Sequence, residues 1–231
     1  RIYDKALSQE EITQLNTLQN QTEYSVTFDD PDGTECDILI VGGGGGGGGG
    51  HGGGGGAGQL VFINNATLNG SYNIKVGNGG FGGTFTGTPG TITQATKGFD
   101  SEFGNITINV IAEGGGANGG NTLKDGGSGA GGDSYTPDGE VTTKGLKNTI
   151  TDTFLSGTVY SKGNDGGTGV AGPSYGQGAG GGGAGSAGGN GGSGTTNASP
   201  GNGGDGLSGI SEIGYDFKTN FGTNVGKLES D

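Results

Sequence analysis

A run of glycine from Gly42 to Gly56 constrains this chain more than any other feature. Every one of its fifteen positions except His51 is glycine, and two apolar stretches, Cys36–Val41 and Gln59–Asn64, flank it. Glycine loses more conformational entropy on folding than any other residue, so such a run is either disordered or ordered by something other than side chains. Flanking stretches with strand character hold both ends of the run and favour the ordered alternative.

Glycine-rich segments return downstream with a period of three residues. Asn78, Phe81 and Thr84 stand three apart with glycine pairs between them. The spacing recurs at Asn118 and Asn121, Asp125 and Ser128, Asp165 to Gln177, Ala184 to Ser193, and Asn202 and Asp205. Three is the number of residues per turn of polyproline II, or of polyglycine II when the residue is glycine. Its bare faces let neighbouring helices approach until their backbones hydrogen-bond, so we expect packed helices rather than flexible linkers.

Alternating polar and apolar residues between the glycine segments predict β-strands. The predicted strands are Tyr24–Phe28, Cys36–Val41, Gln59–Asn64, Ser71–Val76, Asn105–Ile111, two or three within Val141–Tyr160, and Ile210–Phe217. Ser8 and Glu11 form a capping box that predicts one short N-terminal helix. We therefore expect an all-β fold, a jelly-roll-like β-sandwich whose glycine-rich excursions pack as a polyglycine II helix bundle.

The first residues read R-I-Y and then A-L-S-Q-E-E-I. This string resembles the C-terminal strand and helix of concanavalin-A-like, laminin-G-like domains. The resemblance implies that residues 1–22 are the end of such a domain or a linker, and that residues 23–231 form the glycine-rich domain. Because the chain opens on Arg1 with neither Met nor a signal peptide, we expect a processed or partial product of a longer precursor.

Composition and charge exclude several classes of protein. Glycine accounts for 64 of 231 residues, but it does not occupy every third position as collagen requires. The formal net charge of −13 disfavours binding to nucleic acid or to an anionic membrane surface. No apolar window of about 18 residues is present, so we expect no membrane insertion.

Candidate residues for catalysis and metal binding are few. His51 is the only histidine, which excludes a histidine cluster for zinc, and we predict no catalytic residue, no enzymatic activity and no cofactor. Scattered carboxylates at Glu102, Glu113 and Glu140 raise the alternative of a polysaccharide hydrolase, although no pair has an interpretable spacing. The acidic turn is a calcium candidate or a plain turn; its carboxylates are Asp29, Asp30, Asp32 and Glu35.

Two modifications can be considered from the sequence. N-x-S/T sequons make five asparagines glycosylation candidates if the source is eukaryotic, namely Asn20, Asn65, Asn69, Asn105 and Asn197. Cys36 is the only cysteine, so it is either a partly buried residue of a strand or an intermolecular disulfide partner.

The arrangement D-I-L-I-V followed by glycine, then A-G-Q-L-V-F and Y-N-I-K-V-G-N-G-G, resembles known glycine-rich domains. It is similar to the domain of phage tail-fibre and related viral surface proteins, and to the extracellular glycine-rich region of anaplastic lymphoma kinase-type receptors. The chain lacks the cysteines of those receptors. The resemblance implies a β-sandwich that carries polyglycine II helices and serves in host recognition or cytokine binding.

We expect a non-enzymatic structural subunit of an extracellular fibre or filament, assembling as a homo-oligomer or polymer through strands and glycine helices. The alternative is a receptor-binding adhesin of a phage or virus fibre, located on the virion surface and recognising cell-surface glycans or proteins. In that alternative, loops at Thr84–Gly98 and Tyr135–Lys147 carry the contacts.

Overall fold

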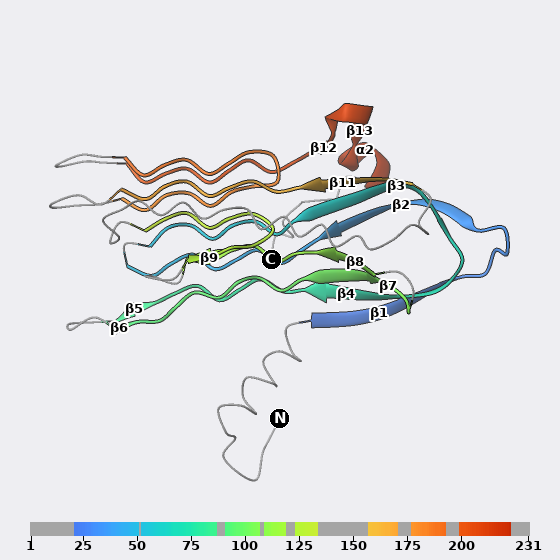
Figure 1. Cartoon of the computed structure of the whole chain (residues 1–231), viewed down its shortest axis with the longest axis horizontal. Helices are drawn as coiled ribbons and strands as arrows, with labels where there is room; N and C mark the ends of the chain where they lie inside the picture. The colour runs from blue at the N-terminus through green and yellow to red at the C-terminus, as the bar shows by residue number, and fades with distance from the viewer. Residues whose placement is uncertain are drawn as a thin grey trace, which may run out of the picture.

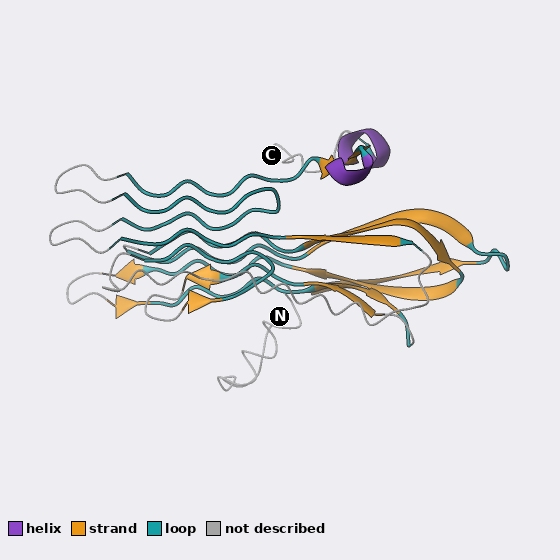
Figure 2. Ribbon diagram, turned by 45° about the horizontal axis from the view of Figure 1, so that its top comes forward, coloured by secondary structure: helices purple, strands orange, loops and turns teal. Residues whose placement is uncertain are grey.

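Long strands and glycine-rich segments occupy opposite ends of the molecule. In the computed structural model, the glycine-rich segments run side by side away from the ends of the long strands (Figures 1 and 2). The structure describes residues 21–50, 52–86, 91–106, 109–118, 123–133, 157–170, 177–192 and 199–222.

A four-stranded antiparallel sheet has the order β1-β4-β7-β8. The pairing of β1 with β4 is continuous over eight residues, and Tyr24 lies opposite Ile74. Val26 and Phe28 of β1 are partly buried, whereas Tyr24 on the same face is exposed, so the alternating burial predicted for this strand holds only in its second half. The strands are β1 (Gln21–Phe28), β4 (Gly70–Gly77), β7 (Ser101–Gly104) and β8 (Asn109–Ala112).

A three-stranded antiparallel sheet has the order β11-β3-β2. A bulge between Cys36 and Ile38 interrupts the pairing of β2 with β3, and β2 is an edge strand of this sheet. The strands are β2 (Thr34–Val41), β3 (Leu60–Leu68) and β11 (Thr158–Lys162).

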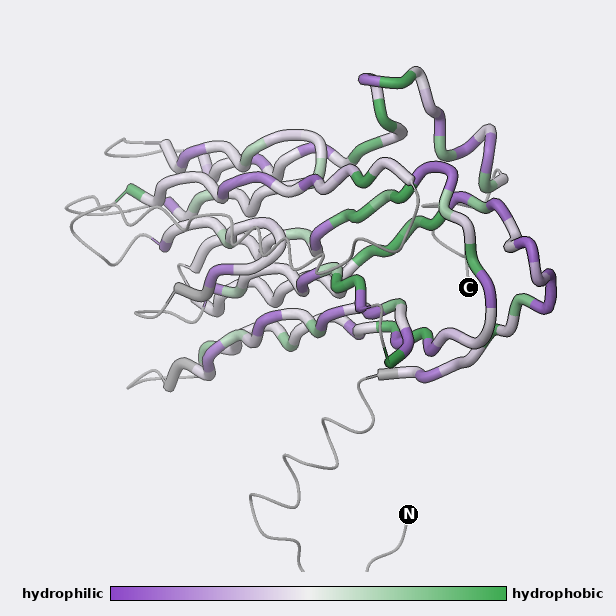
Figure 3. Tube along the Cα trace, turned by 45° about the vertical axis from the view of Figure 1, so that its right-hand side comes forward, coloured by the Kyte–Doolittle hydropathy of each residue, from purple (hydrophilic) through white to green (hydrophobic). Residues whose placement is uncertain are grey.

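The two sheets face each other across one hydrophobic core. Apolar side chains from both sheets meet in it, and Tyr72 of β4 stacks on Phe103 of β7 with ring centroids 5.0 Å apart. Hydrophobic stretches gather in these strands, whereas the glycine segments are pale in Figure 3. The core residues are Ile40, Val61, Ile63, Ala66, Leu68, Tyr72, Phe103, Val110 and Ala112.

The other face of β3 is covered by the C-terminal elements. Phe62 is fully buried and packs against Tyr215 and Phe217, with ring centroids 4.6 and 5.4 Å away. These elements are β12 (Gly209–Ile210), the 3₁₀ helix η1 (Ser211–Ile213), β13 (Tyr215–Asp216) and the helix α2 (Phe217–Phe221).

Short strand pairs lie within the glycine-rich half, where β5 pairs with β6 and β9 with β10. They are β5 (Phe85–Thr86), β6 (Thr91–Ile92), β9 (Ala117–Asn118) and β10 (Leu123–Lys124). Glycine-rich segments without assigned strands make up most of this half. We call this half the glycine bundle; it comprises the described residues within 42–59, 77–100, 113–133, 163–192 and 199–207.

The all-β fold class predicted from the sequence is confirmed. The strand predicted over Ile210–Phe217 is wrong. Gly214, at φ 64°, ends the 3₁₀ helix η1, and the Asp216 side chain accepts a hydrogen bond from the Thr219 N–H and so caps the helix α2. Local capping chemistry therefore outweighs the alternating pattern there.

Some sequence predictions fall on residues outside the described ranges, and others differ from the arrangement in the structure. The predicted N-terminal helix, and all of Val141–Tyr160 before Gly157, lie outside the described residues. β3 and β4 follow each other through Asn69, but they belong to different sheets. Within the strand predicted over Asn105–Ile111, Asn105 and Ile106 are not strand, residues 107 and 108 lie outside the described residues, and β8 begins at Asn109.

Candidate functional site

Hydrogen bonds in the glycine bundle repeat at every third residue. The N–H groups of Gly42, Gly45 and Gly48 donate to carbonyl oxygens of the antiparallel segment 53–59 at 3.0, 2.8 and 2.9 Å. The next residue in each triplet turns to another neighbour, because Gly43 and Gly46 donate to segment 96–99. One segment is thus bonded to two neighbours through two different faces.

Carbonyl groups of the same segment reach further neighbours. Gly44 and Gly47 accept from N–H groups of segment 80–83 at 2.8 Å each, again with a spacing of three. Gly43 and Gly46 accept from N–H groups of segment 115–118. Backbone groups that have no partner within their own segment are therefore satisfied between segments.

Segment 177–184 is bonded in the same way through all three of its rows. Ala179 and Gly182 donate to segment 129–132, while Gly180 and Gly183 donate to segment 186–189. The carbonyls of the third row, Gly178 and Gly181, accept from segment 201–204. Each face of this segment therefore carries its own neighbour.

The close approach of these segments requires glycine. A Cβ atom at Gly46 would overlap the carbonyl oxygen of Phe81, and one at Gly180 would overlap that of Asn202. Gly44 differs, because the nearest atom to its Cβ position is 3.9 Å away. Some glycines of the bundle are thus sterically obligatory and others are not.

Among the described side chains with the three-residue spacing, most lie on the outside of the bundle and two are buried. The Asn118 side-chain amide donates to the Gly131 carbonyl oxygen at 2.7 Å. Ser128 Oγ donates to the Gly183 carbonyl oxygen at 3.3 Å. Both side chains fill interior positions where their polar atoms hydrogen-bond to the backbone.

A belt of polar side chains lies where the strands become glycine segments. Gln59 is fully buried; its Nε2 donates to Ser161 Oγ at 2.6 Å and its Oε1 accepts from the Glu113 N–H at 2.9 Å. Ser101 Oγ donates to the Val41 carbonyl oxygen at 2.7 Å. The belt joins backbone groups at the level where hydrogen bonding changes from the two-residue repeat of β-strands to the three-residue repeat of the glycine segments.

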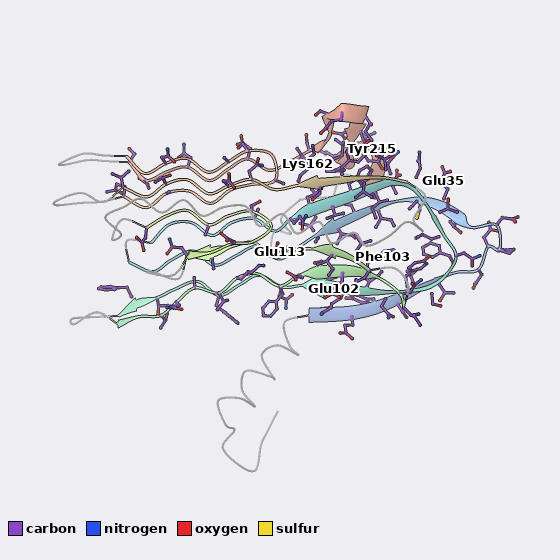
Figure 4. The ribbon with its side chains drawn as sticks, in the orientation of Figure 1. Glu35, Glu102, Phe103, Glu113, Lys162 and Tyr215 are labelled. Atoms are coloured by element: carbon purple, nitrogen blue, oxygen red, sulfur yellow. The ribbon has the colours of Figure 1, made fainter. Side chains whose placement is uncertain are left out.

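Glu113 is the charged member of the belt (Figure 4). One carboxylate oxygen pairs with Lys97 Nζ. Its Oε2 is buried and has no hydrogen-bond partner among the described residues. Glu102, another carboxylate of the hydrolase alternative, pairs with Lys75 at 3.0 Å. Glu140 lies outside the described residues.

A polar groove of about 810 Å³ lies on the four-stranded sheet. Its lining includes the exposed Tyr24, the amides Asn73 and Asn109, and the Lys75–Glu102 ion pair. The amide and charged groups share one face of the sheet and offer hydrogen bonds to a polar ligand, whereas the Tyr24 side chain belongs to the other face. Sequence reasoning missed this groove, because it requires knowing that β1, β4, β7 and β8 are neighbours.

An apolar groove of about 610 Å³ runs beside the edge strand β2, with Val26 and Phe28 of β1 in its wall. Cys36 is half-buried there, and burial and, to a lesser extent, the neighbouring Asp37 carboxylate raise the pKa of its thiol. Tyr215 OH, from the C-terminal strand β13, donates to Asp37 Oδ2 at 2.6 Å. Burial and this hydrogen bond raise the pKa of Tyr215.

Three of the four calcium candidates, Asp29, Asp30 and Asp32, lie on an exposed turn before β2, and Glu35 lies within β2. Asp30 Oδ1 accepts from the Asp32 N–H at 3.0 Å, and the Asp30 carbonyl accepts from the Gly33 N–H. Among the described residues, no group of three or more His, Cys, Asp or Glu side chains is arranged to hold a metal ion. Asp29, Asp30, Asp32 and Glu35 therefore do not form such a group.

Three of the sequon asparagines lie on the sandwich. Asn65 is exposed at φ 57°, Asn69 is exposed with its side-chain amide donating to the Pro31 carbonyl, and Asn105 is half-buried. Asn20, Asn197 and His51 lie outside the described residues. Glycosylation stays a prediction.

The structure describes only part of the two loops that were predicted to carry adhesin contacts. Thr84–Gly98 is part of the bundle rather than a free loop, because Thr93 and Thr96 donate to the Thr84 and Phe81 carbonyl oxygens at 2.9 Å. Residues 87–90 and Tyr135–Lys147 lie outside the described residues.

Comparison with known proteins gives one result. A family model for a glycine-rich domain matches residues 20–226. No curated protein and no solved structure matches the chain significantly. Among the described residues, no helix is both long and apolar enough to pass through a membrane.

Proposed function

Because the chain belongs to the glycine-rich domain family, we propose that it is a non-enzymatic structural subunit of an extracellular fibre or filament. In this proposal the glycine bundle is a rigid rod of polyglycine II helices, and the two sheets form the jelly-roll-like sandwich that anchors it.

One observation carries the proposal, namely that hydrogen bonding repeats every third residue and joins each segment to several neighbours. A threefold repeat without hydrogen bonds inside the segment is the geometry of polyproline II and polyglycine II. A bundle bonded in several directions resists bending, which suits a structural element. At a rise of about 3.1 Å per residue, segment 42–50 extends roughly 28 Å.

Negative-stain microscopy of the purified protein over a range of concentrations tests the proposal. We expect straight polymers that lengthen with concentration. A Gly46→Val variant, which cannot pack the bundle, provides the matched control and should form none. A protein that stays monomeric in every condition would contradict the structural role.

A second candidate is a receptor-binding adhesin of a phage or virus fibre, and the groove containing Tyr24, Asn73 and Asn109 favours it. We expect Asn73→Ala with Asn109→Ala to abolish binding to a glycan array or to cells. Asn202→Ala, an exposed change on the bundle, should leave binding intact. Equal binding by both variants would remove the support for this function.

The location and ancestry that accompany these functions are also proposals. We place the protein outside the cell or on a virion surface, in line with the resemblance to phage tail-fibre proteins. Its single cysteine argues against a receptor of the anaplastic lymphoma kinase type. The laminin-G-like origin of residues 1–22 is part of the same proposal.

A further inference from the structure

One side of the glycine bundle carries a groove that is lined mostly by glycine. Two adjoining hollows of about 450 Å³ each share Gly55, Gly181 and Gly203 in their linings, so together they form one groove along segments 52–58, 177–184 and 200–207. Glycine makes up most of the wall. The non-glycine lining residues are Val41, Ala57, Leu60, Gln177, Ala179, Ala184, Pro200 and Leu207.

Several glycines that line this groove have no backbone hydrogen-bond partner among the described residues. Gly203 and Gly206 make no backbone hydrogen bond to any other described residue, and neither does Gly55. The spacing of Gly203 and Gly206 is the same three-residue spacing that joins segments elsewhere in the bundle. A Cβ atom at either residue would meet nothing within 4 Å. The groove therefore has the form of a vacant position for one more segment.

The opposite side of the bundle offers a matching ridge on segment 77–86. Gly79 and Gly82 are exposed, stand three residues apart, and make no backbone hydrogen bond among the described residues. The nearest atoms to their Cβ positions are 3.6 and 3.7 Å away and belong to the bundle itself. The segment leading to β5 lies at one margin of the bundle, and the segment leading to β12 lies at the other (Figures 1 and 2).

We propose that the Gly203–Gly206 groove binds the Gly79–Gly82 ridge of a second copy of this chain, an inference that rests on the proposed fibre function. The bare walls exclude a chain with bulky side chains at the contact, because backbone must approach backbone for hydrogen bonds to form. A second copy supplies a segment with the required threefold spacing and bare face.

Charge supports a second copy as the occupant. The formal net charge of −13 makes copies repel one another over most of their surface. No charged residue lines either hollow of the groove. The exposed Asp205 stands between Gly203 and Gly206, but segment 77–86 carries no charged residue, so no like charge opposes it in this contact.

The geometry also determines the kind of assembly. Groove and ridge are different surfaces on opposite sides of one bundle, so their contact is heterologous. A heterologous contact that does not close into a ring produces an open filament. The bundle of each subunit would then continue into the bundle of the next.

Two double variants test this inference. Gly203→Val with Gly206→Val blocks the groove, and Gly79→Val with Gly82→Val blocks the ridge. Both place side chains in open positions, so we expect thermal unfolding close to that of the wild type. Ala187→Val, on an exposed part of the bundle outside both surfaces, is the matched control.

Sedimentation velocity and negative-stain microscopy provide the measurement. We expect wild type and Ala187→Val to polymerise and each double variant to stay monomeric. A mixture of the two double variants retains one groove and one ridge per pair, so it should form dimers that grow no further.

Polymers from either double variant alone would overturn the groove assignment while leaving the fibre function standing. A wild type that forms no polymers, but pairs through these surfaces in the mixture, would overturn the fibre function and keep the contact. A mixture without dimers would overturn the contact.

Discussion

Replacing Gly46 by valine tests whether the bundle is held by backbone contacts. Gly46 is buried, and even the Cβ atom of the new side chain would overlap the carbonyl oxygen of Phe81. The structure therefore excludes every side chain at this position, not only a branched one. Two segments must move apart to admit the substitution.

The cost follows from the bonds that this movement breaks. The two overlapping segments are joined by two bonds, from the Gly80 and Gly83 N–H groups to the Gly44 and Gly47 carbonyl oxygens at 2.8 Å each. Losing both bonds costs about 2 kcal/mol at about 1 kcal/mol each, and forcing atoms into a packed site costs about 1–3 kcal/mol. We expect a loss of about 3–5 kcal/mol, which lowers Tm by about 10 °C in a protein of this size.

Thermal unfolding followed by circular dichroism gives the readout, with Gly44→Val as the control. The nearest atom to the Gly44 Cβ position is 3.9 Å away, so this change adds the same side chain two residues earlier without overlap. We expect the control to stay within about 0.5 kcal/mol of the wild type. Equal Tm values for the two variants would refute the packing argument and support a flexible linker.

Three further predictions concern side chains outside the glycine rows. Gln59→Ala leaves the Glu113 N–H without its side-chain acceptor inside the polar belt, so urea denaturation should show a loss of about 2–4 kcal/mol. Tyr215→Phe removes the hydrogen bond to Asp37 and should cost about 1–2 kcal/mol. Burial and that bond raise the pKa of Tyr215. The stability that the hydrogen bond contributes to the fold is therefore fully present below the ordinary tyrosine pKa of about 10 and is lost as pH rises above it. In denaturation series across pH, Tyr215→Phe should lack this alkaline loss of stability. Burial and Asp37 raise the pKa of the Cys36 thiol, so a thiol reagent at pH 8 should modify folded protein more slowly than urea-unfolded protein, and equal rates would contradict the burial.

The sequence allowed the long strands and the threefold spacing to be predicted, because both follow from short repeats. The stretch leading to Val41 is a strand, and glycine pairs mark segments that bond to their neighbours. Side chains at the threefold positions are mostly exposed, as one face of such a segment allows. Asn118 and Ser128 are the exceptions, and spacing alone does not distinguish them.

The grooves and the polar belt could not be predicted, because they depend on partners far apart in the sequence. Gln59 meets Ser161 across 102 residues, and Asp37 meets Tyr215 across 178. The alternating pattern of Ile210–Phe217 also misleads. Gly214 ends a 3₁₀ helix and Asp216 caps a helix there, so the predicted strand is a turn and a helix instead.

The polypeptide backbone, rather than apolar side chains, makes most of the contacts in the glycine bundle. Exposing apolar surface raises the heat capacity on unfolding, whereas exposing polar peptide groups lowers it. The bundle should therefore give this protein a smaller heat-capacity change than the roughly 12–15 cal/mol/K per residue typical of globular proteins. Calorimetry should then show that the free energy of unfolding depends less steeply on temperature. Because a small part of the fold is apolar core, the protein should also resist unfolding in the cold.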